Sequence, residues 1–164
     1  RAVLLLLARL GLRAHEIIGL RLEDCDWDAG CLRVRSKGGR ERLLPMLADV
    51  GEAIAAYLER GRPASQDRHL FLRSVAPIRG FKPGSDAIGS IVRYALRRAR
   101  VDAPHSGSHQ FRHALAVRML ERGASLAQIG EVLGHRSPQT TSIYARVDIS
   151  SLRSLAPPWP GGTR

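Results

Sequence analysis

A histidine and an arginine three residues apart are the first candidates for chemistry in this sequence. His109 and Arg112 fall in a segment with helical spacing, so their side chains share one face, and His113 takes the next position of that face. An arginine can hold two phosphate oxygens in a planar fork, and a histidine can exchange a proton near neutral pH. The group suits phosphoryl chemistry, although such a pair taken alone is more often structural.

The same two histidines, four residues apart on a helix, also have the spacing of a zinc-binding pair. Gln110 stands where the zinc-protease pattern HExxH has its glutamate, and Arg112 would bring a positive charge against the cation. The sequence therefore predicts no metal site here.

A tyrosine near the C-terminus is the candidate nucleophile. Tyr144 follows the motif Leu133-Gly134-His135 by nine residues and falls in a predicted helix. A tyrosine hydroxyl has an unperturbed pKa near about 10, so attack at neutral pH needs a base or positive surroundings. A lone tyrosine on a helix is more often a packing residue, so its importance depends on the residues placed around it.

Two further candidates lie at turns in the first quarter of the chain. Arg13 follows Gly11, a residue suited to ending a helix, and falls in a tight connection between two helices. Lys37, one of only two lysines, lies in a Gly-Gly turn between two short β-like stretches. Such a turn predicts a β-hairpin that carries the lysine at its tip.

The elements that must position these residues are mostly helical. Apolar spacing and turn residues predict helices over 2–10, 14–22, 48–60, 85–100 (capped by Ser85), 108–122, 126–133 (with a Ser125/Gln128 capping box) and 138–147. Strands are predicted over 31–36 and 41–46, with a short one at 69–72 and a further possible one within 73–83. The expected fold class is α+β, mainly α, with a small antiparallel sheet.

Composition and charge limit the function classes. The chain has 164 residues, of which 44% are hydrophobic, so it can form a core and is not disordered as a whole. Its formal net charge of +11 predicts a polyanionic partner. A basic cluster in the predicted helix 85–100 offers candidate contacts to phosphate groups, with a solvated face as the alternative: Arg93, Arg97, Arg98 and Arg100.

Neither a membrane span nor a disulfide framework is expected. The apolar run at 2–7 is far shorter than the roughly 20 residues that a span requires. Cys25 and Cys31 lack the spacing of secreted small domains, which favours a reducing cytoplasm. The chain begins with Arg1, inside a helical pattern, and is expected to be a fragment of a longer protein.

The order of the candidate residues resembles the catalytic domain of tyrosine recombinases, the phage integrase family. GLRAHEIIGL at 11–20 is similar to the family's first arginine motif, with Glu16 in the acidic position. SKGGRERLLP at 36–45 is similar to its lysine hairpin and SHQFRH at 108–113 to its central box. LGH at 133–135 followed by TTSIY at 140–144 completes the set, so the resemblance spans about residues 1–148.

The resemblance implies DNA cleavage by tyrosine, without metal or other cofactor. Tyr144 would attack a scissile DNA phosphate and form a 3′-phosphotyrosyl link, releasing a 5′-hydroxyl for later strand exchange and religation. Arg13 and Arg112 would hold the non-bridging oxygens, and Lys37 would protonate the departing 5′-oxygen. His109 would exchange protons with the tyrosine.

The same resemblance adds one more catalytic residue and two supporting ones. His135 would act in catalysis by hydrogen-bonding the phosphate. Glu16 would orient Arg13 rather than react, with a solvent-facing acid as the alternative. His113 would support the site from behind, with packing as the alternative.

The resemblance also implies an assembly. Family members normally carry an N-terminal DNA-clamping domain, so the expected organisation is a catalytic domain over 1–148 and a C-terminal tail over 149–164, with the clamping domain missing. The implied partner is double-stranded DNA, bound by a homotetramer in which the tail packs onto a neighbouring subunit. The expected location is the cytoplasm, in association with DNA.

Two other functions stay open from the sequence. A type IB topoisomerase uses much the same tyrosine chemistry but rejoins the original ends. A non-catalytic DNA-binding module is the second, because two predicted helices around Gly134-His-Arg-Ser137 have the form of a helix-turn-helix. The second alternative does not explain the lysine hairpin or the His109/Arg112 pair.

Overall fold

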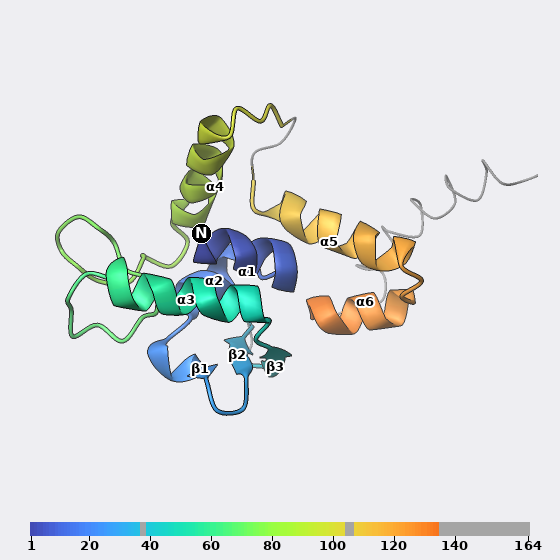
Figure 1. Ribbon diagram of the computed structural model, residues 1–164, viewed down its shortest axis with the longest axis horizontal. Coiled ribbons are helices and arrows are strands. Elements are labelled where there is room, and N and C mark those ends of the chain that lie inside the picture. The colour runs from blue at the N-terminus through green and yellow to red at the C-terminus, as the bar shows by residue number, and fades with distance from the viewer. Residues whose placement is uncertain (37–38, 104–106, 135–164) are drawn as a thin grey trace, which may run out of the picture. The chain divides into compact units, whose positions relative to one another are not determined.

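The computed structural model describes residues 1–36, 39–103 and 107–134 (Figure 1). These residues fall into two compact units, residues 1–115 and the part of the chain from Ala116 onward. The first holds helices α1 (Ala2–Leu10), α2 (Ala14–Gly19), α3 (Ala48–Arg60) and α4 (Ala87–Arg98), with strands β1 (Cys25–Asp26), β2 (Cys31–Arg35) and β3 (Glu41–Pro45). Helix α5 (His109–Glu121) begins in the first unit, and α6 (Leu126–Leu133) belongs to the second. The predicted mainly helical α+β class is confirmed.

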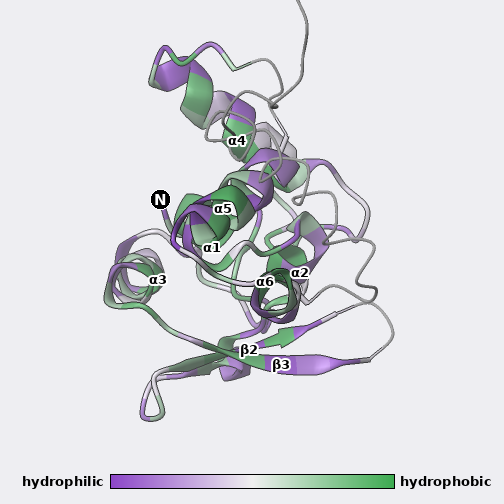
Figure 2. Cartoon of the chain, turned by 90° about the vertical axis from the view of Figure 1, so that its right-hand side faces the viewer, coloured by the Kyte–Doolittle hydropathy of each residue, from purple (hydrophilic) through white to green (hydrophobic). Residues whose placement is uncertain are grey.

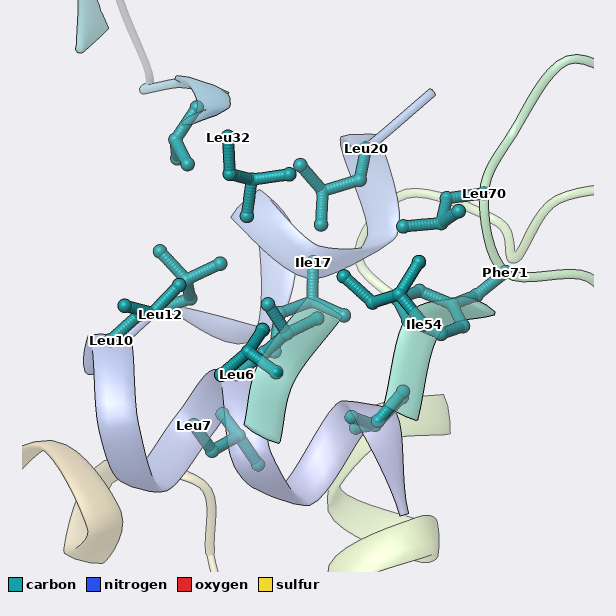
Figure 3. Packing of buried hydrophobic residues seen from close by; sticks show 14 of the residues in the cluster. Leu6, Leu7, Leu10, Leu12, Ile17, Leu20, Leu32, Ile54, Leu70 and Phe71 are labelled. Atoms are coloured by element: carbon teal, nitrogen blue, oxygen red, sulfur yellow. The ribbon is translucent and has the colours of Figure 1, made fainter. Parts of the chain in front are cut away.

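The core of the first unit surrounds α1. This helix carries apolar residues on nearly every side, because it packs against both α3 and α4. Leu6 and Leu7 are fully buried, and Leu12, Ile17 and Leu20 continue the same cluster through α2 (Figure 3). The turn between α1 and α2 is therefore fixed from both sides by buried leucines and isoleucines.

The sheet is a three-stranded antiparallel meander in the order β1-β2-β3. Leu32 pairs with Cys25 on one side and Leu44 on the other, and this row faces the core. Val34 is also fully buried and pairs with Arg42. The predicted hairpin is confirmed, and the third strand is β1, a segment for which no strand was predicted.

Helix α2 is shorter than predicted. It ends at Gly19 rather than near residue 22, and Leu22–Asp24 form a separate 3₁₀ turn. The turn has its own start, because the backbone N–H of Arg21 donates to the Asp24 carboxylate at 2.9 Å. This local cap competes with continuation of the helix.

The long connection between α3 and α4 contains no regular strand. The strands predicted at 69–72 and within 73–83 are only the isolated bridges Arg21↔His69 and Leu72↔Gly80. Asp67 holds this connection together, accepting the backbone N–H groups of His69 and Gly80, each at 2.8 Å. These bonds and the His69 ring lower the pKa of Asp67. A Cβ at Gly80 would lie 2.5 Å from the His69 ring, so this close approach requires glycine.

Helix α4 starts one residue later than its predicted cap. Its N-cap is Asp86, and the backbone N–H of Ser85 donates to the Lys82 carbonyl at 3.0 Å in the preceding turn. The predicted start of α6 is confirmed: Ser125 and Gln128 donate their backbone N–H groups to each other's side chains.

Among the described helices, none is long and apolar enough to cross a membrane.

Candidate active site

The turn between α1 and α2 presents Arg13. Gly11 ends α1 with φ 60° and ψ 29°, the left-handed conformation that glycine adopts without steric cost. Arg13 then begins α2 in an extended conformation, and its backbone N–H donates to Glu16 at 2.8 Å. Its side chain is 26% exposed.

Arg112 reaches this same turn from far along the chain. It lies in the first turn of α5 and is only 5% exposed. Its Nη1 donates to the carbonyl oxygen of Gly11 at 2.7 Å, a contact between residues 101 positions apart. The neighbouring Phe111 packs against the core and anchors the start of the helix. The structure thus brings Arg112 to the turn that carries Arg13.

The two histidines of α5 differ from Arg112 in burial. His109, the first residue of the helix, and His113 are both exposed, whereas Arg112 between them is buried. The exposure of His109 suits proton exchange with a bound molecule. The exposure of His113 disfavours the alternative that it is a packing residue.

Glu16 is the buried anion of the site. Its side chain is fully buried, and its carboxylate accepts the Arg13 backbone N–H, the Arg13 side chain at 3.3 Å and the Ser36 hydroxyl at 3.0 Å. Arg42 Nη2 donates to both oxygens, at 3.2 and 3.1 Å. The alternative of a solvent-facing acid is therefore wrong, because water does not reach this side chain.

The charge on Glu16 is stabilised by these donors. Burial raises the pKa of the carboxyl group, but the Arg13 N–H, the Arg42 charge, the Ser36 hydroxyl and the Arg13 charge together lower it below its ordinary value. Glu16 is therefore ionised at neutral pH and holds guanidinium groups in place.

Sequence reasoning missed Ser36 and Arg42. A signal was present for Arg42, because it stands two residues before Leu44 in a strand and so shares the inward face of the sheet. A charged residue at such a position requires a buried partner of opposite charge. The partner, Glu16, could not be identified from the strand alone.

Three predicted site residues, Lys37, His135 and Tyr144, lie outside the described residues, as does the predicted helix over 138–147. The structure does describe residues next to Lys37 and next to His135 in the sequence. Ser36 and Gly39 flank the lysine position in the β2–β3 connection, and the Gly39 N–H donates to the Ser36 carbonyl at 3.2 Å. Gly134 ends α6 in the left-handed conformation directly before residue 135.

The basic residues of α4 are exposed, but they are not equivalent. Arg93 pairs with Asp86 and donates to the Ser90 hydroxyl, so part of its hydrogen-bonding capacity is already used. Arg98 lies over the ring of Tyr94, 5.8 Å from its centroid. Together with Arg97 it gives the C-terminal end of α4 its hydrophilic character (Figure 2).

Comparison with known proteins places these features in a family. The model described as the phage integrase family matches residues 1–150, which include every candidate residue of the site. This chain belongs to the phage integrase family. The resemblance expected from the sequence motifs is confirmed.

Curated relatives of this integrase-family chain are recombinases by name. The protein y4rA of Sinorhizobium fredii, named as a candidate integrase/recombinase, is 60% identical over 98% of this chain and 39% of its own length. The tyrosine recombinase XerD of Mycobacterium tuberculosis is 38% identical over 98% of this chain and 51% of its own. The chain thus spans about two fifths of the length of the first relative and about half of the second.

Solved structures share the integrase-family fold. The crystal structure of XerA recombinase superposes with a TM-score of 0.78 and 28% identity, covering 94% of this chain and 55% of that chain. XerH site-specific recombinase, solved with a palindromic difH substrate after cleavage, gives a TM-score of 0.74 at 22% identity, covering 96% and 44%. The fold is that of a tyrosine recombinase catalytic domain.

Proposed function

We propose that this chain is the catalytic domain, over residues 1–148, of a site-specific DNA recombinase that cuts and rejoins strands through a covalent tyrosine intermediate. The observation that carries the proposal is the contact of the Arg112 guanidinium with the turn that presents Arg13. Two arginines gathered at one turn suit the two non-bridging oxygens of a phosphodiester.

In the proposed reaction, the Tyr144 hydroxyl oxygen attacks the phosphorus atom and the bond from phosphorus to the 5′-oxygen breaks. His109 takes the tyrosine proton, and Lys37 gives a proton to the leaving 5′-oxygen. The product is a 3′-phosphotyrosyl link and a free 5′-hydroxyl. Attack by the 5′-hydroxyl of another strand reverses these steps, releases the tyrosine and conserves the energy of the bond.

Arg13 and Arg112 would stabilise the transition state electrostatically, and His135 would donate a hydrogen bond to the phosphate. Their charges act where negative charge grows on the non-bridging oxygens, the task that metal ions perform in many phosphoryl-transfer enzymes. The proposed reaction is therefore independent of metal. Glu16 keeps Arg13 in place, and the backbone contact at Gly11 does the same for Arg112.

The proposed partner is double-stranded DNA. The net charge of +11 favours a polyanion, and the exposed Arg97, Arg98 and Arg100 offer backbone contacts, with Arg93 joining them if it leaves Asp86. The structure of XerH contains its difH DNA. Exchange between two duplexes requires four strand cleavages, so the proposal includes a homotetramer on DNA.

Trapping of a covalent protein–DNA adduct tests this function. The complete gene product that carries this chain first selects its binding site from fragments of its own genomic DNA. That site is then made as a nicked duplex, from which a short 5′-hydroxyl fragment escapes after cleavage and leaves the adduct trapped. We expect an adduct with the wild type and none with Tyr144→Phe, while Tyr94→Phe, on exposed α4, serves as the matched control and keeps the adduct.

The other outcomes decide between the alternatives. Binding without an adduct in the wild type would make the chain a non-catalytic DNA-binding module. An adduct with relaxation of supercoiled DNA but no exchange between two sites would indicate a topoisomerase.

A further inference from the structure

The β2–β3 hairpin extends beyond the rest of the sheet. Strand β1 pairs only with the first two residues of β2, Cys31 and Leu32. Residues 33–35 of β2 therefore have β3 as their only neighbouring strand in the described part of the chain. A two-stranded ribbon by itself is only marginally stable in water. The orientation of this ribbon relative to the core therefore depends on contacts made by its side chains.

Arg35, the last residue of β2, makes such contacts in two directions. Its Nη1 lies 2.7 and 2.8 Å from the two carboxylate oxygens of Asp24, which ends the 3₁₀ turn before β1. Its Nε donates at 3.0 Å to Glu41, the first residue of β3 and its partner in the strand register. One guanidinium thus links the two strands and connects both of them to the turn.

Asp24 is a fixed anchor for this contact. Its side chain is almost fully buried, and its carboxylate also accepts the backbone N–H of Arg21 at 2.9 Å. The turn is held by the long connection between α3 and α4, because the Leu22 N–H donates to the Arg68 carbonyl at 3.0 Å. Movement of the ribbon away from the turn would leave a buried carboxylate without its guanidinium, which is costly. The Arg35 contact therefore opposes such movement.

We propose that Arg35 is a positioning residue for proton transfer: by joining β2, β3 and Asp24, it holds the hairpin in the orientation from which Lys37 protonates the leaving 5′-oxygen. The inference rests on the proposed function, which makes Lys37 the proton donor. The lysine follows Arg35 by two residues. Strand pairing continues up to the residue before it, because the Ser36 N–H donates to the Arg40 carbonyl at 2.8 Å. The direction of the ribbon at Arg35 therefore determines where the lysine begins.

The opposite face of the hairpin is held separately. Val34 is buried in the core, and the side chains of Ser36 and Arg42 both donate to the Glu16 carboxylate. Side chains alternate between the two faces of a strand, so these contacts lie on the face that Arg35 does not use. They remain when Arg35 is replaced. We therefore expect Arg35→Gln to fold, with a hairpin that is less firmly oriented.

Replacement of the leaving oxygen by sulfur tests whether Arg35 positions a proton donor. In a duplex with a 5′-bridging phosphorothiolate at the scissile position, the bond from phosphorus to sulfur breaks. The sulfur departs as a thiolate without taking a proton, because a thiol is far more acidic than an alcohol. This sulfur duplex and the otherwise identical oxygen duplex are both made with the selected binding site. Single-turnover formation of the Tyr144 adduct by the complete gene product is measured on each.

The expected result is a loss that depends on the leaving group. Arg35→Gln should cleave the oxygen duplex about 10- to 100-fold more slowly than wild type, and the sulfur duplex within about threefold of wild type. Lys37→Ala, which removes the proton donor itself, should show the same pattern with a loss of about 100-fold or more on the oxygen duplex.

Arg33→Gln is the matched control. Arg33 lies on the same strand and the same face as Arg35, and the two side chains are 44% and 43% exposed. Its described ion pair, with Glu41, is long at 3.9 Å. The control should cleave both duplexes at the wild-type rate, to within about twofold.

A double variant shows whether Arg35 acts through the lysine. If it does, Arg35→Gln combined with Lys37→Ala cleaves the oxygen duplex as slowly as Lys37→Ala alone, because the proton donor that Arg35 positions is already absent. If the two losses multiply, Arg35 acts on another part of the reaction and the inference is wrong.

A second variant covers the case in which Arg35→Gln does not fold, as judged by its thermal melt. Glu41→Gln keeps the pair between Arg35 and Asp24 and weakens only the link to β3. It should slow cleavage of the oxygen duplex by about 3- to 10-fold and recover on the sulfur duplex in the same way.

The results that overturn the inference differ from those that overturn the function. An equal loss on both duplexes, or no loss, in Arg35→Gln means that Arg35 does not position the proton donor, even though the wild type forms its Tyr144 adduct. An equal loss on both duplexes in Lys37→Ala removes the lysine as proton donor, and the inference with it, but leaves the nucleophile in place. Absence of the adduct in the wild type removes the proposed function and the inference together.

Discussion

Glu16 and Asp24 occupy equivalent positions in two consecutive segments of the chain. Each lies three residues after an arginine whose backbone N–H it accepts, at 2.8 Å from Arg13 and 2.9 Å from Arg21. Each is almost fully buried, and each receives an arginine from the β2–β3 hairpin.

The partners of the two carboxylates differ. Asp24 receives Arg35, which is 43% exposed and also bonded to Glu41, while the residue that caps its turn, Arg21, is exposed. Glu16 receives the more buried Arg42 and, in addition, the side chain of Arg13. The same local arrangement therefore connects the hairpin to Asp24, and at Glu16 it also includes the side chain of Arg13, the arginine that we propose binds the DNA phosphate.

The largest expected difference concerns catalysis. Arg13→Gln should slow DNA cleavage by about 100- to 1000-fold, because it removes a charge that acts on the transition state. Arg21→Gln, at the equivalent position beside Asp24, should leave the rate within about twofold of wild type. Single-turnover adduct formation measures both, and equal rates in the two variants would contradict the assignment of separate tasks.

Stability should also separate the two carboxylates. Glu16→Gln leaves two guanidinium groups, at 16% and 26% exposure, without their negative partner, at an expected cost of about 3–5 kcal/mol in the free energy of unfolding. Asp24→Asn should cost about 1–3 kcal/mol, because Arg35 is better hydrated and keeps Glu41.

Urea unfolding of both variants measures this difference. Glu59→Gln serves as the control, since it breaks a pair that is 73% and 65% exposed and should change the free energy by less than about 0.5 kcal/mol. If Glu16→Gln lost less free energy of unfolding than Asp24→Asn, the additional arginine at Glu16, Arg13, would contribute nothing to stability.

The pH dependence of stability should give the smallest effect. The pKa of Glu16 is lowered in the folded protein, so its stabilising contribution is complete above the ordinary value of 4.5 and is lost as the pH falls through the folded pKa. The difference in unfolding free energy between wild type and Glu16→Gln should therefore decrease as the pH falls below about 4.5. Urea unfolding between pH 7 and pH 3 tests this, and a difference that grows on acidification would reverse the assigned direction.

Local features of the fold were predictable because short-range physics determines them. Gly11 ends α1 and Ser125 begins α6 as predicted, since a left-handed turn and a capping box depend on neighbouring residues alone. Predictions failed where a distant or competing partner decided the result. Strand β1 forms because Cys25 pairs with Leu32, and α2 stops early because Asp24 caps a new turn.

The candidate site shows the same division. The sequence by itself determined which residue types are present, their order, the helix that carries His109 and Arg112 and the turn that carries Arg13. Only the tertiary structure decided that Arg112 reaches Gly11 and that Glu16 takes Arg42 and Ser36 as well as Arg13. The reason is physical: helix spacing and turns follow from contacts within a few residues, whereas a buried charge is stabilised by whichever donors the packed core brings to it.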